Sequence, residues 1–135
     1  MKAKSSCEMK NWEEEIFRKL SDQKKTARAS AEFTMKGEIE GVADEEFLLY
    51  YKKYDDKDEA KGVASFQGLM MFDGKIGGKS GGFVLEDHGL YEAGTAKSTL
   101  KIVDDSGTGD LKGIRGTAVF QSTKDSASFE LDYSL

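Results

Sequence analysis

Apolar and polar residues alternate along most of the chain with a period of two, which is typical of β-strands. In the segment 26–36, Ala27 and Phe33 share one face. Arg28 and Lys36 lie on the opposite face. Comparable segments follow at about 42–54, 63–73, 82–91, 94–103, 110–122 and 127–134, separated by turns rich in glycine, aspartate or serine. The pattern therefore predicts seven strands and an all-β domain.

The segment 8–20 is ambiguous. Met9, Trp12, Ile16 and Leu20 have helix-like spacing, and the glutamates between them favour a helix. If the segment is a strand instead, the chain has eight. Eight antiparallel strands can close into a barrel that has room for side chains or for one small ligand.

A chain of 135 residues is typical of a single domain. We expect one barrel domain over 1–135, with 1–8 as a flexible N-terminal tail. In the segment 42–54, Phe47 lies on one face and Leu48 on the other, so we expect both faces of this strand to be covered. The charged run 54–62 predicts a solvated loop.

The composition makes several classes of function improbable. The single cysteine, Cys7, allows neither an internal disulfide nor a thiolate metal cluster. A net charge of −5 with interleaved signs disfavours nucleic-acid binding. No apolar segment has the length of a signal sequence core or a membrane span. These features predict a cytoplasmic protein without a metal, cofactor, nucleic-acid or membrane partner.

Two glycine-rich segments resemble phosphate-binding loops but lack their spacing. GKIGGKS at 74–80 lacks the first glycine of that motif, and a strand rather than a helix is predicted after it. SGTGDLKG at 106–113 lies between strands. Asp104, Asp105 and Asp110 form no complete calcium loop. Both segments therefore predict turns.

Asp87 is the most interesting single position. In a strand it shares a face with Phe83, whereas Glu86 and His88 share the other, so we expect His88 at the surface. If the Phe83 face is interior, Asp87 is a buried carboxyl that must be paired, hydrogen-bonded or protonated. Arg115 is its predicted partner if that face of its strand is also interior. The alternative is an aspartate at the barrel mouth that contacts water or a turn.

Aromatic residues are distributed over most of the predicted strands, and each is a core residue by default. The candidate ligand-binding residues are Trp12, Phe33, Tyr51, Phe66, Asp87 and Arg115, and the candidate catalytic residues are Asp87 and Tyr51.

The segments TARASAEFTMKGEIEGVADEEFLLYY, ASFQGLMMFDGKIGGKSGGFVLEDHG and SGTGDLKGIRG resemble, in that order, an uncharacterised bacterial family of unknown function with an allene oxide cyclase-like barrel. The resemblance covers about 9–135. It implies an eight-stranded antiparallel barrel whose first strand contains Trp12. Proteins that share this barrel include allene oxide cyclase, dirigent proteins and natural-product cyclases, which hold a reactive apolar molecule. The chain departs from the family pattern at Asp104-Asp105, where Pro-Gly is common, and at Asp87, where histidine is common.

Three functions follow as expectations. The first is a soluble barrel that binds a small, largely apolar molecule. The second is an isomerase or cyclase in which Asp87 or Tyr51 assists proton transfer. The third is a ligand-free structural or partner-binding barrel, with Leu69 and Met71 as a homodimer surface. A filled interior favours the third function, and an open cavity with a buried acid favours the second.

Overall fold

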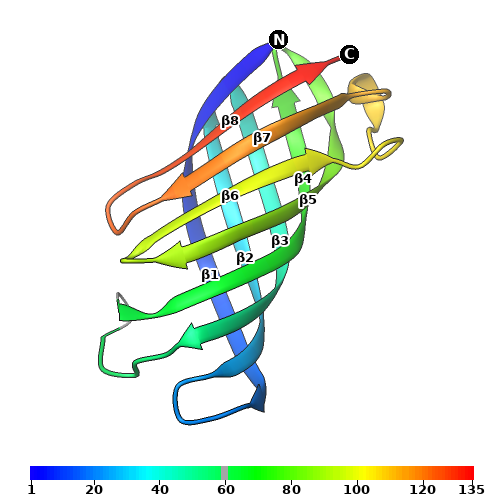
Figure 1. Ribbon diagram of the computed structural model, residues 1–135. Helices are drawn as coiled ribbons and strands as arrows, with labels where there is room; N and C mark the ends of the chain where they lie inside the picture. Colours follow the sequence, from blue (N-terminus) through cyan, green and yellow to red (C-terminus); the bar gives the residue numbers. More distant parts are fainter. Residues whose placement is uncertain (59–60) are drawn as a thin grey trace.

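The computed structural model describes residues 1–58 and 61–135. Within these residues, eight antiparallel strands form one closed barrel, in which consecutive strands pair and β8 pairs with β1 (Figure 1). The strands are β1 (Lys2–Lys19), β2 (Lys25–Gly37), β3 (Ile39–Lys53), β4 (Val63–Ile76), β5 (Lys79–Glu92), β6 (Thr95–Ile102), β7 (Arg115–Ser122) and β8 (Ala127–Ser134). The predicted all-β, eight-stranded fold is confirmed.

Strand β1 differs from the sequence-based expectation at its start. It begins at Lys2 and pairs with β8 through Lys2–Ser6, so the expected flexible tail over 1–8 is wrong. The ambiguous segment 8–20 is mostly strand and pairs with β2. A register shift lies between Lys10 and Glu13, where Asn11 has a φ of 56°. The extra residue changes which side chains of β1 face the barrel interior.

The two ends of the barrel are built differently (Figure 1). We call the end with both termini the terminal end, and the end with the β1–β2, β3–β4, β5–β6 and β7–β8 connections the hairpin end. The β6–β7 connection contains the 3-10 helix η2 (Gly109–Leu111), which packs against the start of β5 at the terminal end, and the connection buries Leu111 and Ile114. Its Thr108 amide donates to the Gly82 carbonyl at 2.9 Å. The predicted strand over 110–122 therefore begins only at Arg115.

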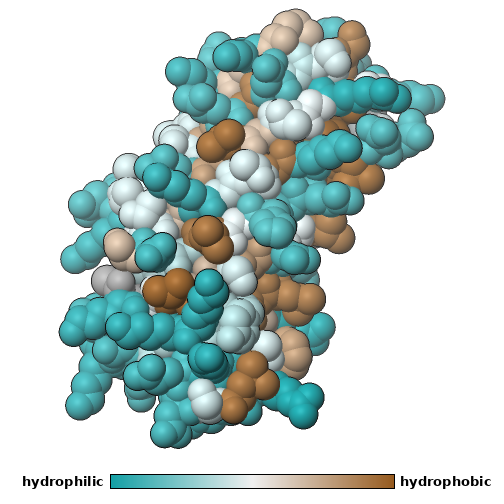
Figure 2. Space-filling model, in the orientation of Figure 1, coloured by the Kyte–Doolittle hydropathy of each residue, from teal (hydrophilic) through white to brown (hydrophobic). Residues whose placement is uncertain are grey.

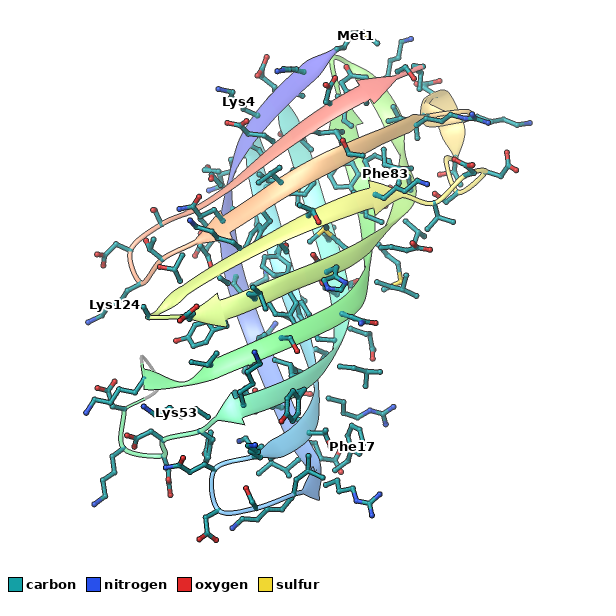
Figure 3. All side chains as sticks on the ribbon, in the orientation of Figure 1. Met1, Lys4, Phe17, Lys53, Phe83 and Lys124 are labelled. Carbon is teal, nitrogen blue, oxygen red and sulfur yellow. The ribbon has the colours of Figure 1, made fainter. Side chains whose placement is uncertain are left out.

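Alternate side chains of the strands point inward and form a single apolar core. The Phe33 ring packs against Phe120 in a T-shaped arrangement with centroids 5.6 Å apart, and Phe72 packs against Phe83 at 5.1 Å. The ring of Phe83 lies in the upper part of the barrel in Figure 3. The other large buried residues include Met35, Ile39, Met70, Ile76, Leu85, Leu100, Ile102, Phe129 and Leu131.

The outer face is mixed in polarity. Leu48 is exposed, so the expectation that both faces of β3 are covered is wrong. Leu69 and Met71 are exposed on β4, as the alternation predicts, and His88 is exposed on β5. Figure 2 shows apolar residues distributed among polar ones on one face of the molecule. None of the helices in the described chain has the length and apolar character needed to cross a membrane.

Residues 54–58 and 61–62 of the charged segment lie between β3 and β4, and residues 59 and 60 are outside the described part of the chain.

Candidate functional site

The inner wall of the barrel is less completely buried toward the hairpin end. Side chains deeper in the barrel, such as Leu85 and Leu131, have at most 1% of their surface exposed. Phe47 and Phe66 retain 8%, although both point inward. Leu111 and Ile114, at the terminal end, have at most 1% exposed, so we attribute the residual exposure of Phe47 and Phe66 to the hairpin end. We call the inner wall of this half of the barrel the recess.

An aromatic row crosses the recess from β1 to β4. The Trp12 ring packs against Phe47 with centroids 5.6 Å apart, and Phe47 packs against Phe66 in a T-shaped arrangement at 5.6 Å. Although its ring contacts an inward-facing residue, Trp12 is 41% exposed. The reason is that β8 stops pairing with β1 at Ser6, and within the described chain no strand pairs with that side of β1 beyond this residue.

A buried cation lies at the mouth of the recess. The ammonium group of Lys25 is 3.7 Å from a carboxylate oxygen of Glu14 and 3.3 Å from the ring centroid of Tyr54. The Tyr51 ring is 4.6 Å away, and its hydroxyl donates to Glu14 at 2.8 Å. Beside this cluster is a hollow of about 130 Å³ lined by the β1–β2 turn and Tyr54. The mouth therefore contains an ammonium group held between aromatic rings and a carboxylate.

Deeper in the recess, two carboxyl groups meet. Glu45 on β3 is 1% exposed and Asp87 on β5 is 5% exposed. Burial raises the pKa of Glu45 to about 11, and the hydrogen bond to Asp87 and its charge act in the same direction. Two carboxylates cannot both be ionised at hydrogen-bond distance without a large cost, so the Glu45 carboxyl keeps its proton near neutral pH.

The carboxyl pair exists because a glycine lies between the two strands. Gly68 on β4 is opposite Phe47 on one side and Asp87 on the other. A Cβ atom at Gly68 would be 2.9 Å from Oε2 of Glu45. The absent side chain thus leaves the space through which Glu45 approaches Asp87.

Several buried polar atoms of the barrel interior have no hydrogen-bond partner among the described residues. They are Oε2 of Glu45, Oδ1 of Asp87, and the hydroxyls of Ser98 and Ser5. Ser98 on β6 is opposite Gly89, two residues along β5 from Asp87 toward the hairpin end. Such atoms are normally satisfied by water or a ligand, because an unsatisfied buried polar group costs about 1–3 kcal/mol.

A second hollow, of about 490 Å³, extends over β1 to β4 and is lined mostly by outward-facing residues, among them Glu13, Glu32, Asp44 and Met71, and also by Glu45. Among the described residues, no group of three or more histidine, cysteine, aspartate or glutamate side chains is placed to hold a metal ion.

Residues 3–133 match a family described as "Protein of unknown function (DUF3224)". The chain belongs to the DUF3224 family. A crystal structure of a DUF3224 protein of unknown function from Shewanella oneidensis MR-1 is similar, with a TM-score of 0.80 and 22% identity. The alignment covers 100% of this chain and 97% of the other. At this identity the likeness establishes the fold alone. No functionally curated protein matches the chain.

This DUF3224 barrel brings together most of the residues singled out from the sequence. Trp12, Tyr51, Phe66 and Asp87 all lie on the inner wall toward the hairpin end, and Phe33 is buried in the core against Phe120. Tyr51 and Asp87 are not adjacent. Tyr51 on β3 and Tyr91 on β5 both pair with Ala64 of β4, so they lie at the same level of the barrel. Asp87 is four residues from Tyr91 along β5, a distance of about 13 Å.

Arg115 is the exception in the DUF3224 site. It is exposed at the start of β7, where the inward positions are Ala118 and Phe120. The predicted pairing of Arg115 with Asp87 is therefore wrong. Asp87 meets the buried carboxyl of Glu45 instead of a cation.

Sequence reasoning missed Glu45, Ser98, Lys25 and Glu14. The inward orientation of Glu45 could have been predicted, because Glu45 is two residues from Phe47 and alternate residues of a strand face the same side. However, Glu45 lies in the run Ala-Asp-Glu-Glu, and such an acidic run suggests a solvent-exposed segment instead. The inward orientation of Glu14 depends on the register shift after Lys10, which the alternation of residues does not reveal.

Proposed function

We propose that this DUF3224 protein binds a small, largely apolar molecule in the recess of its barrel. The observation that carries the proposal is the position of Trp12, whose ring packs on inward-facing Phe47 yet is 41% exposed. Ligand sites combine apolar and aromatic walls with a few polar groups that orient the ligand. The aromatic row supplies the wall, and the carboxyl pair of Glu45 and Asp87 supplies the polar groups.

The difference between the two ends of the barrel supports this assignment. Leu111 and Ile114 are buried at the terminal end, whereas Phe47 and Phe66 keep 8% of their surface exposed, so a ligand would enter at the hairpin end. Ile16 is 51% exposed there, and its backbone partner on β2 is the fully buried Ala27. An exposed apolar side chain on the inner face of a strand gains burial when a ligand covers it.

Binding can be measured through Trp12, because it is the only tryptophan in the chain. Titration with the apolar dye N-phenylnaphthylamine should quench tryptophan emission and enhance dye emission by energy transfer. Ile16→Glu at the mouth should weaken dye binding roughly tenfold, because each 1.4 kcal/mol of lost burial is a factor of ten.

Leu48→Glu is the matched control, since Leu48 is comparably exposed on the outer face of β3. It should leave dye affinity unchanged. The proposal fails if dye binding leaves Trp12 emission unaltered, or if both variants weaken binding equally. Native mass spectrometry of freshly purified protein adds a direct search for a co-purified molecule.

A second candidate is an isomerase or cyclase, favoured by the buried, protonated Glu45 that is hydrogen-bonded to Asp87 beside an aromatic wall. A carboxyl pair of this kind can transfer a proton to or from a bound carbon acid. Tetralone, an apolar ketone, should then exchange its α-protons with deuterated water faster in the presence of the protein. Asp87→Asn should abolish the acceleration, and an unaltered exchange rate with the wild-type protein would exclude proton transfer on this class of molecule.

A further inference from the structure

We propose that two copies of this chain pair through one edge of β1, where residues 13–19 of one copy add antiparallel to residues 13–19 of the other. We call the side of β1 beyond Ser6 that pairs with no described strand the free edge. This inference goes beyond the proposed function and does not depend on it, because no ligand takes part in the contact. Three observations support it: the unpaired backbone, the apolar side chains gathered there, and the order of charges along the strand.

The free edge is long. One side of β1 pairs with β2 as far as Lys19, whereas its pairing with β8 on the other side stops at Ser6. The hairpin of β1 and β2 consequently extends past the neighbouring strands at the lower end of Figure 1. An unpaired strand edge presents a row of backbone N–H and C=O groups that another extended segment can satisfy.

Apolar side chains gather along the same part of β1. All of residues 8–19 are exposed, whereas buried positions alternate regularly along β2. Ile16 is 51% exposed and Phe17 is 59% exposed, and Phe17 lies near the lower end of the molecule in Figure 3. Clustered exposed apolar residues mark interaction surfaces, because covering them removes apolar area from water.

The order of charges identifies the occupant of the free edge as a second copy. Three glutamates at 13–15 precede Ile16 and Phe17, and the basic residues at 18–19 follow them. A second copy that runs in the opposite direction brings its basic end against the acidic end of the first, and the reverse contact occurs at the same time. Opposite charges directly across a strand pair are stabilising, and like charges are destabilising. The segment is therefore complementary to itself.

The register of this pairing is consistent with the two faces of the sheet. Arg18 is three residues from Glu15, but the register shift between Ile16 and Arg18 brings both side chains to the outer face. A two-fold axis perpendicular to the sheet keeps outer side chains on the outer face. With the axis at Ile16 and Phe17, Glu15 of each copy lies opposite Arg18 of the other. Neither Glu15 nor Arg18 forms an ion pair within the described chain, so both are available.

The free edge also limits the assembly to two copies. The register shift between Lys10 and Glu13 interrupts the edge, so regular pairing is confined to the segment beyond it, and β1 ends at Lys19. A two-fold contact uses the same patch on both copies. Once the two segments have paired, this edge is no longer open to a third copy, and the assembly closes as a dimer.

Charge exchange at the interface tests this register. Sedimentation velocity of the full chain, without ligand, should show a dimer that dissociates on dilution. Glu15→Arg and Arg18→Glu each place like charges opposite each other at two symmetric contacts, so each should raise the dimer dissociation constant roughly tenfold. The two substitutions combined restore opposite charges and should restore the dimer. Glu8→Arg is the matched control, because it makes the same change on β1 before the register shift, and it should keep the dissociation constant of the parent.

Several results would overturn the inference while leaving the proposed function intact. A parent protein that is monomeric at every concentration would show that the free edge does not pair with a second copy. A dimer that both single variants leave unchanged would use another surface, such as Leu69 and Met71. A combined variant that melts like the parent but stays monomeric would show that residues 15 and 18 are not opposite each other. Hydrogen exchange adds a backbone measurement: amides of residues 13–19 should exchange more slowly in the dimer than in the Glu15→Arg monomer, and equal rates would contradict the pairing.

Discussion

The carboxyl group of Glu45 occupies the space that a side chain at Gly68 would fill. A Cβ atom at Gly68 would be 2.9 Å from Oε2 of Glu45 and 2.4 Å from the backbone oxygen of Glu46. Gly68 is also the residue opposite Asp87 on the neighbouring strand. A position without a side chain therefore decides that two acids from different strands meet inside the barrel.

This relationship makes Gly68 sensitive to the smallest substitution. Gly68→Ala should lower the free energy of unfolding by about 1–3 kcal/mol, because backbone and carboxyl atoms must both shift to admit the methyl group. Urea denaturation measures the change. Gln67→Ala, at the adjacent exposed position, should stay within about 0.5 kcal/mol of the parent. Equal stability of Gly68→Ala and the parent would show that the strand can relax at this point.

The Glu45 carboxyl predicts how stability depends on pH. Its pKa is raised from an ordinary 4.5 to about 11 in the folded chain, so the folded state binds more protons than the unfolded state between these values. Stability is therefore greatest below about pH 4.5 for this group and falls as pH rises, by at most about 1.4 kcal/mol per pH unit.

Glu45→Gln tests this dependence, because it retains a donor toward Asp87 but removes the titrating proton. Between pH 5 and pH 8 the variant should lose less stability than the parent, as measured by urea denaturation at each pH. Glu46→Gln, the neighbouring exposed residue, should keep the parent slope. Parallel curves for the parent and Glu45→Gln would contradict the raised pKa of Glu45.

The turn between β5 and β6 contains a strained residue. Ala93 and Gly94 both have positive φ, at 53° and 75°, as a two-residue type I′ hairpin turn requires. Alanine is disfavoured in this region, whereas asparagine tolerates it. Ala93→Asn should therefore stabilise the barrel by about 0.5–1 kcal/mol and raise the melting temperature by about 2–4 °C. Ala96→Asn, inside β6, should be destabilising, and a lower melting temperature for Ala93→Asn would show that the turn is not strained.

The homodimer remains a prediction from the sequence. Leu69 and Met71 are exposed on the outer face of β4, and they lie opposite Glu46 and Asp44 of β3. If this strip forms a self-complementary interface, light scattering after gel filtration should give twice the chain mass. Leu69→Glu with Met71→Glu should then yield a monomer, while Leu90→Glu, nearer the hairpin end, should not. A monomeric parent protein would exclude the homodimer.

Alternation of residues was sufficient to predict much of the architecture and the single most informative residue of the site. Asp87 shares its parity with Phe83, and both are buried inside the barrel. The same rule places His88 outside. These inferences succeed because a strand buried on one face has a strict two-residue period.

Other features depend on information that the period does not carry. The register shift near Asn11 changes the inward face of β1, so Trp12 and Ile16 had spacing that resembled a helix. Gly109 and Gly113 adopt positive φ and interrupt the strand expected from 110. The meeting of Glu45 with Asp87 is a contact between strands, and its space comes from Gly68. This contact depends on how β3, β4 and β5 are aligned with one another, and the sequence of one strand alone does not determine that alignment.

One edge of β1 has no pairing strand beyond Ser6 in the described chain, and unpaired strand edges favour association at high protein concentration. Beyond Ser6, the backbone groups on that side of β1 face no other strand of the described chain and could template the addition of a foreign strand. The kink at Asn11 and the inward carboxylate of Glu14 interrupt this surface, and both are devices by which natural sheets resist aggregation. The register shift that turns Trp12 toward the barrel interior thus also interrupts an edge that could otherwise pair with a strand of another molecule.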